Sequence, residues 1–298
     1  MNTSLAQADF GARDSAIRCQ TYSPVQMHPG VPRETFAAYW RDVHGPLCSR
    51  LPGLGFYVQH HFSRTIYANL WPLAPGVRRI DFPLDGAVEI GFPDADAMER
   101  FGKASPLLFG DEVNVFGWDA AYFLPNGSRT FVDKQADGIP NGPDRLHRLH
   151  VYMHAKTGVD MKAWVTGFAE TLAADQAVLK LRLHLPEPYD NTNPQPPSPV
   201  DHEVRKDMLE LAVMEIGFET ALTARRFFES ERFSATKTGQ SAHIEAMAAH
   251  FVTGVYTFVR DSIPTTAGLR GSRVAEIIEA VGATNHLLGD VTRLFTRS

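Results

Sequence analysis

The chain has 298 residues, more than one domain usually holds, and this length favours two domains or one duplicated unit. Hydrophobic residues make up 44% of the sequence and charged residues 21%, and no apolar run approaches the roughly 18 residues that span a bilayer, which argues against membrane insertion. The net charge is -5 with Lys and Arg dispersed, so no basic stripe is available for nucleic acid.

The start of the chain and its cysteines indicate the compartment. Residues 1–16 lack the basic start and the apolar run of a secretory leader. Cys19 and Cys48 match no metal-ligand spacing and give no support for a disulfide framework, so we expect both to be buried small hydrophobes. These features predict a cytoplasmic protein.

The first part of the chain predicts alternating strands and helices. A helix follows Pro32, because apolar side chains from Phe36 to Leu47 recur at three- and four-residue spacing on one face. The predicted strands cover residues 17–23, 56–62, 89–92 and 118–124. The order strand, helix, strand, strand, helix, strand is the ferredoxin-like arrangement, and we place this unit at residues 17–125.

An internal repeat predicts a second unit of the same kind. Glu89-Ile90-Gly91-Phe92, followed by Arg100-Phe101, recurs as Glu215-Ile216-Gly217-Phe218 with Arg226-Phe227, at an offset of about 126 residues. Each copy reads as a short apolar strand that passes through a turn into a helix. A tandem duplication is therefore predicted.

The rest of the chain follows from this repeat. Residues 126–144 are rich in Gly, Pro and Asn and are predicted to be a linker. The second, degenerate ferredoxin-like unit then covers residues 145–260, with a helix over 158–173 and strands over 149–154, 178–185, 212–218 and 254–259. Residues 261–298 are predicted to form a C-terminal helical extension that could cap a barrel end.

The two units are predicted to bury each other. A four-stranded sheet with helices on one face leaves its opposite face to be covered. Two such sheets packed face to face make one intramolecular α/β barrel of the α+β class, with its helices outside. Since the duplication supplies this interface within one chain, both a monomer and a homodimer are compatible with the sequence.

Two segments of the first unit resemble the EthD family of dimeric α/β-barrel proteins. They are Phe36-Ala37-Ala38-Tyr39-Trp40-Arg41-Asp42-Val43-His44-Gly45-Pro46-Leu47, and Leu51-Pro52-Gly53-Leu54 with Tyr57-Val58-Gln59-His60-His61. The resemblance implies the barrel, an apolar pocket, and activities that include decarboxylation, cyclisation and oxygenation of aromatic or polyketide-like molecules, usually without a bound cofactor. We therefore expect no cofactor. We also expect no metal, because the histidine spacing matches no metal motif, although the twelve histidines keep a site open.

The second copy departs from this pattern. Aligning Trp40 with Phe168 places Leu172 opposite His44, so the second copy lacks the family histidine. One active site near the first unit is expected.

Three residues are the predicted catalytic set: His44, His61 and Tyr57. His44 lies one helical turn after Trp40, and an imidazole there can act as general acid or base; the alternative is a histidine that only caps local backbone. His60 and His61 are adjacent on a strand and must point to opposite faces, and His61 matches the family position better. Either could instead be a satisfied interior histidine.

Aromatic and polar neighbours complete the predicted site. The candidate substrate-binding residues are Tyr22, Trp40, His60 and Trp118. Stacking on an aromatic ligand, hydrogen bonding to its oxygen and ordinary core packing are all open for the aromatic members. No dinucleotide loop, phosphate loop, serine elbow or metal-binding His spacing is present in the sequence.

These features predict a cofactor-independent lyase, decarboxylase or isomerase acting on a small hydrophobic aromatic or polyketide-like compound by His acid/base catalysis. Three alternatives stay open: a cofactor-free monooxygenase, a non-catalytic protein that binds an aromatic ligand, and a haem-binding protein.

Overall fold

The computed structural model describes residues 10–66, 70–135 and 138–296. After helix α1 (Phe10–Ala16), the first unit has the predicted ferredoxin-like order. Its strands and helices are β1 (Cys19–Met27), α2 (Arg33–Tyr39), the π-helical η1 (Trp40–His44), α3 (Gly45–Ser49), β2 (Phe56–Phe62), β3 (Arg78–Arg79), β4 (Gly86–Phe92), α4 (Ala95–Ala104), α5 (Pro106–Val115), β5 (Phe116–Asp119) and β6 (Tyr122–Leu124).

The second unit repeats this order. Its elements are β9 (His147–Ala155), α6 (Met161–Ala173), β10 (Val178–His184), the 3-10 helix η2 (Lys206–Met208), β11 (Leu211–Phe218), α7 (Ala221–Phe228), α8 (Glu231–His243) and β12 (Ile244–Arg260). The last strand begins ten residues before the predicted start at Gly254, because β12 is long enough to pair with both β9 and β2. Among the residues in the described ranges, no helix is both long and apolar enough to cross a bilayer.

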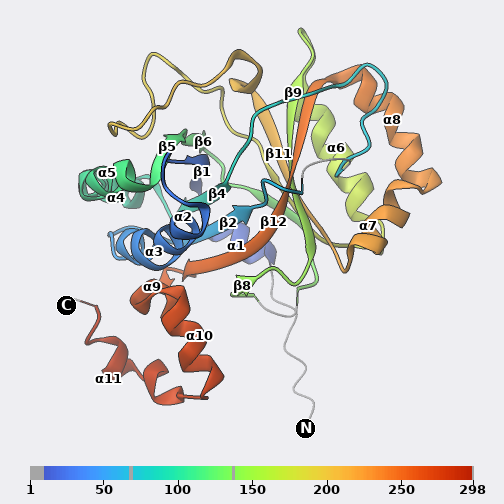
Figure 1. Cartoon of the computed structure of the whole chain (residues 1–298). Coiled ribbons are helices and arrows are strands. Elements are labelled where there is room, and N and C mark those ends of the chain that lie inside the picture. Colours follow the sequence, from blue (N-terminus) through green and yellow to red (C-terminus); the bar gives the residue numbers. More distant parts are fainter. Residues whose placement is uncertain (1–9, 67–69, 136–137, 297–298) are drawn as a thin grey trace.

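The two sheets join into one. The strand order is β5-β1-β4-β2-β12-β9-β11-β10-β7, and the seam between the units is the antiparallel pair β2–β12, in which His60 faces Val255. Figure 1 shows the helices of the first unit on the left, those of the second on the right, and the strands between them. Side chains from both sheets, including Tyr22, Val58 and Val213, pack into one cluster, so the sheets face each other as expected.

The opposite seam is closed differently. There β10 pairs with β7 (Arg129–Asp133), and Trp118 at the edge of β5 forms a bridge to Asp201 in the long loop before β11. The segment interpreted as a linker, residues 126–144, therefore carries two strands, since β8 (Asn141–Pro143) pairs with β12. Both strands satisfy backbone groups that an edge would otherwise leave free.

The C-terminal extension packs against α3 of the first unit and against strands β12 and β8. It comprises β13 (Ile263–Pro264), α9 (Thr266–Arg270), α10 (Ser272–Ala280), the 3-10 helix η3 (Thr284–Leu287) and α11 (Gly289–Thr292). Ser49 on α3 donates a hydrogen bond of 2.6 Å to the carbonyl of Gly268, and Asp42 accepts one of 2.8 Å from the backbone of Arg273. The extension thus stabilises the helical segment of the first unit (Figure 1).

The barrel interior differs from the expected apolar pocket. The side chains between the two sheets include a buried polar set: Gln20, His60, Glu89, Arg148, His150, Arg182, His184 and Glu215. The apolar cavity lies instead on the other face of the first sheet, under its helices. Strand alternation assigns each residue to one face or the other. Cys19 and Cys48 are free and buried, as predicted.

Candidate functional site

A cavity of about 390 Å³ lies between the first sheet and helices η1, α4 and α5. This volume is in the range of small-molecule sites. Its walls are mainly apolar, and the polar side chains among them are few. The lining includes Val25, Trp40, His44, Cys48, Tyr57, Val88, Ile90, Phe92, Met98, Phe101, Leu108, Phe109, Glu112, Phe116, Asp119, Phe123 and Pro196.

The π-helical turn places His44 in this wall. Pro46 has no backbone N–H, so the regular helical bonding cannot continue through it. The N–H of Gly45 instead donates a hydrogen bond to the carbonyl of Trp40, five residues earlier. The same carbonyl accepts a hydrogen bond of 3.0 Å from Gln59 Nε2. His44 at the end of this turn is only 6% exposed. Such π turns often occur at functional sites.

Gly45 should be needed for this placement. A Cβ built there would lie 2.4 Å from the ring of Phe258 on β12. We expect Gly45→Ala to lower the free energy of unfolding by about 1–3 kcal/mol through overpacking. Urea denaturation measures this. Gly110→Ala on α5 is the matched control, because nothing lies within 4 Å of its Cβ, and it should not destabilise. Equal losses in both variants would contradict the argument.

His44 has a carboxylate partner from α5. Its Nδ1 lies 2.9 Å from Asp111 Oδ2, and Asp111 Oδ1 accepts 2.5 Å from the hydroxyl of Tyr39. Burial raises the pKa of Asp111, but the bonds from His44 and Tyr39 outweigh it and hold that pKa below its ordinary value. An ionised Asp111 fixes the imidazole and leaves Nε2 as the nitrogen for a substrate.

Two further carboxyl groups face the cavity. Burial, and then the charge of Asp119, raise the pKa of Glu112 to about 7. Burial also raises the pKa of Asp119, although His202, whose Nδ1 lies 2.7 Å from Asp119 Oδ1, opposes the shift. Glu112 Oε2 is buried without a hydrogen-bond partner in the described part of the chain. Glu112 is therefore a carboxyl that holds its proton up to neutral pH.

Glu112 should make stability depend on pH. In the unfolded chain a Glu ionises near about pH 4.3, but in the folded state Glu112 stays protonated to about pH 7, so stability falls as the pH rises between these values and then levels off. The loss is on the order of 3 kcal/mol. We expect Glu112→Gln to remove it, as measured by urea denaturation from pH 4 to 8. Glu99→Gln, an exposed control on α4, should keep the wild-type profile; the same profile in Glu112→Gln would contradict the assignment.

Tyr57 and Trp40, both predicted from the sequence, also line the cavity. The Tyr57 hydroxyl accepts a hydrogen bond of 2.8 Å from Gln59 Nε2. Burial raises the pKa of Tyr57 well above the ordinary value, so this hydroxyl stays protonated. His61 lies on the same face of β2 but stacks on Trp40, with ring centroids 4.4 Å apart. It is outside the cavity lining, and no described contact joins it to His44.

The structure places the other three predicted residues on the opposite face of the sheet. Tyr22 and His60 lie in the barrel interior, where the Tyr22 hydroxyl is 2.7 Å from His150 Nδ1. Trp118 packs against Phe82 and donates 2.9 Å to the carbonyl of Glu203. These three side chains are not brought together with His44.

Sequence reasoning missed Asp111, Glu112 and Asp119. The acidic pair Asp111-Glu112 follows the apolar run Leu107-Leu108-Phe109 within one helix. Carboxyl groups on an otherwise apolar helix are a signal that could have been used.

The fold and this cavity define a duplicated ferredoxin-like α+β protein with a His–Asp pair in an apolar pocket. Comparison with family models matches residues 28–107 to the EthD domain. The resemblance read from the sequence is thereby confirmed, and the matched segment holds His44, Trp40 and Tyr57. Among curated proteins there is no match.

Solved structures with a similar overall arrangement have very different sequences. A protein from Fusobacterium nucleatum subsp. nucleatum ATCC 25586 described as a putative monooxygenase has 10% identity and a TM-score of 0.48, over 81% of this chain and 94% of its own. An anthrone oxidase-like protein has 9% identity and a TM-score of 0.43, over 80% and 92%. A dye-decolorizing peroxidase from Bacteroides thetaiotaomicron VPI-5482 has 11% identity and a TM-score of 0.42, over 80% of this chain and 93% of its own. Values this low do not transfer an activity to this chain.

The cavity chemistry does not fit a haem. A haem carries two propionates, which are bound by cationic or solvated groups. No Lys or Arg is among the residues that line the cavity in the described ranges, whereas Glu112 and Asp119 are. The described lining of this cavity therefore offers the propionates no cationic partner.

Proposed function

We propose that this protein is an enzyme that moves protons on a small, mostly apolar, oxygen-bearing compound of the aromatic or polyketide type, as a lyase, decarboxylase or isomerase. The observation that carries the proposal is the His44–Asp111 pair at 2.9 Å in the wall of the apolar cavity. In such a site a base works in low dielectric, where its charge interactions are strong.

The residues divide the chemistry in a simple way. His44 Nε2 takes a proton from a carbon next to a carbonyl, or from a phenol, and Asp111 stabilises the imidazolium that forms. The negative charge moves to the substrate oxygen. The Tyr57 hydroxyl, or the protonated Glu112, donates a hydrogen bond to that oxygen. Return of the proton to another carbon gives isomerisation, and departure of a hydroxyl group from the neighbouring carbon, protonated to water, gives elimination. Decarboxylation instead breaks the bond to the carboxylate carbon and leaves the electron pair on the substrate, and the protonated Glu112 supplies the proton to that carbon.

Asp111 replaces His61 in this proposal as the partner of His44. His61 supports the site indirectly, because its ring stacks on Trp40 and Trp40 lines the cavity. Burial lowers the pKa of His61 to about 3, so it stays neutral and is a poor general acid near neutral pH.

A substrate panel tests the proposal. The full chain would be incubated with phenolic and polyketide-like acids, with and without oxygen, and the products analysed by mass spectrometry. We expect a product of unchanged mass, or one that has lost carbon dioxide or water, under both atmospheres. An oxygen-dependent gain of mass would instead establish a cofactor-free monooxygenase that uses the same base. Tight binding without conversion would establish a binding protein and refute the enzyme.

A further inference from the structure

A second cluster of reactive side chains lies in the barrel interior, on the face of the first sheet opposite the cavity. It consists of His60 on β2, His150 on β9 and Glu215 on β11, so both units contribute. Each residue offers one ligand atom, and these atoms lie within 4.8 Å of one another. All three residues are at most 2% exposed.

Each imidazole uses one nitrogen and leaves the other free. His60 Nε2 lies 3.2 Å from Glu89 Oε1, and His150 Nδ1 lies 2.7 Å from the hydroxyl of Tyr22. The remaining nitrogens, His60 Nδ1 and His150 Nε2, are buried and have no hydrogen-bond partner in the part of the chain that the structure describes. Buried polar atoms are normally paired, so two unpaired nitrogens in one cluster call for a ligand.

We propose that His60, His150 and Glu215 form a binding site for one first-row divalent transition metal such as Zn²⁺. Two imidazoles and one carboxylate suit these ions better than Mg²⁺ or Ca²⁺, which prefer all-oxygen sites. Ligands bound tetrahedrally at about 2.0–2.2 Å lie roughly 3.3–3.6 Å apart, so the donor atoms, which lie within 4.8 Å of one another, need to move together by no more than about 1.5 Å.

Neighbouring residues are arranged to support such ligands. Glu89 accepts a hydrogen bond from His60, and Arg148 Nη1 donates one to Glu215. The Tyr22 hydroxyl contacts His150 and also lies 2.8 Å from the hydroxyl of Tyr152. Metal-binding histidines usually carry such a bond on the nitrogen that faces away from the ion. Tyr22, predicted from the sequence as a substrate residue, has a positioning role here.

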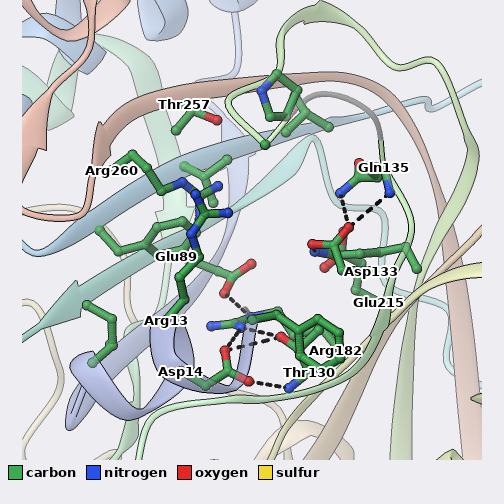
Figure 2. Close-up of a pocket in the computed structure, with 18 of the residues that line it drawn as sticks. Arg13, Asp14, Glu89, Thr130, Asp133, Gln135, Arg182, Glu215, Thr257 and Arg260 are labelled. Atoms are coloured by element: carbon green, nitrogen blue, oxygen red, sulfur yellow. Dashed lines mark hydrogen bonds and ion pairs between the residues drawn. The ribbon is translucent and has the colours of Figure 1, made fainter. Parts of the chain in front are cut away.

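The cluster also has an access route. A pocket of about 220 Å³, lined by His60 and Glu215, lies beside it. Figure 2 shows Glu89, Arg182 and Glu215 among the residues around this pocket, with the carboxylate of Asp14 bonded to Arg182 and Thr130. The three protein ligands leave at least one tetrahedral position for water or a small oxygen ligand from this side.

Metal binding by the full chain tests the site. Protein freed of metal by a chelator would be titrated with Zn²⁺, Co²⁺ and Mg²⁺ by calorimetry. We expect one Zn²⁺ or Co²⁺ per chain and no saturable binding of Mg²⁺. His150→Gln and Glu215→Gln should weaken Zn²⁺ binding by at least about 100-fold, which exceeds the loss usual for supporting residues.

The control is His184→Gln. His184 is a buried interior histidine whose Nε2 is also unpaired and whose Nδ1 contacts Ser128 at 2.7 Å, but it is not in the cluster. The affinity of His184→Gln for Zn²⁺ should lie within about threefold of the wild-type affinity. Absence of one-to-one binding, or an equal loss in His184→Gln, would overturn the proposal.

A measurement on the wild-type chain covers variants that fail to fold. A crystal grown with Zn²⁺ should give an anomalous peak at the zinc edge between these three side chains. A peak elsewhere, or none, would overturn the assignment. Neither result depends on the His44 site, because binding is measured without turnover.

Discussion

Replacing His44 by Gln should lower the turnover of the converted compound by about 10²–10⁴-fold, the usual contribution of a positioned general acid or base. Gln is close in size to His, and the lost Asp111 contact is at the edge of a cavity, so the free energy of unfolding should change much less. The measurement is kcat at saturating substrate, with urea denaturation to confirm that the variant folds. This is the largest effect on activity that we expect from a single substitution.

Two comparisons make the His44 result specific. His28→Gln alters an exposed histidine in the loop before α2 and should keep wild-type turnover. Asp111→Asn keeps the shape of the partner but removes its charge, so it should reduce kcat while leaving the fold intact. Wild-type turnover in His44→Gln would remove His44 from the mechanism and leave the cavity without its proposed base.

The largest effect on stability should come from Arg148→Met in the barrel interior. Arg148 is 2% exposed, donates 2.7 Å to Asp144, and pairs with Glu215. Removing its charge leaves two carboxylates buried without their partner, which costs about 3–5 kcal/mol. Urea denaturation at pH 7 measures the loss.

The pH dependence gives this prediction a second readout. In the folded protein the pKa of Glu215 lies below its value in the unfolded chain, so its ionised form stabilises the fold above about pH 4.3 and that contribution is lost as the pH falls. The loss of stability in Arg148→Met should therefore be largest at neutral pH and smallest in acid. Arg129→Met is the control, because Arg129 is 60% exposed and its pair with Glu170 should contribute less than about 1 kcal/mol. A similar loss in both variants would contradict the buried-pair argument.

Local patterns were enough to predict most elements. The strand at residues 56–62 was predicted correctly, and the helix predicted over residues 158–173 is α6, because alternation and helical spacing are properties of short stretches of chain. The second unit was predicted because the short Glu-Ile-Gly-Phe and Arg-Phe patterns recur along the chain. The strands inside residues 126–144 were missed, because β7 and β8 are short and are held by pairing with β10 and β12 rather than by their own composition.

The sequence by itself determined the duplicated ferredoxin-like order, the position of His44 on a helix, and the opposite orientation of His60 and His61. Only the tertiary structure decided what each of these side chains meets. Asp111 is 67 residues from His44 and reaches it only because α5 packs beside η1. His60, His150 and Glu215 come from both units and converge because the two sheets face each other. Periodicity is local and can be read along the chain, whereas the partner across a packed interface depends on how distant elements are placed.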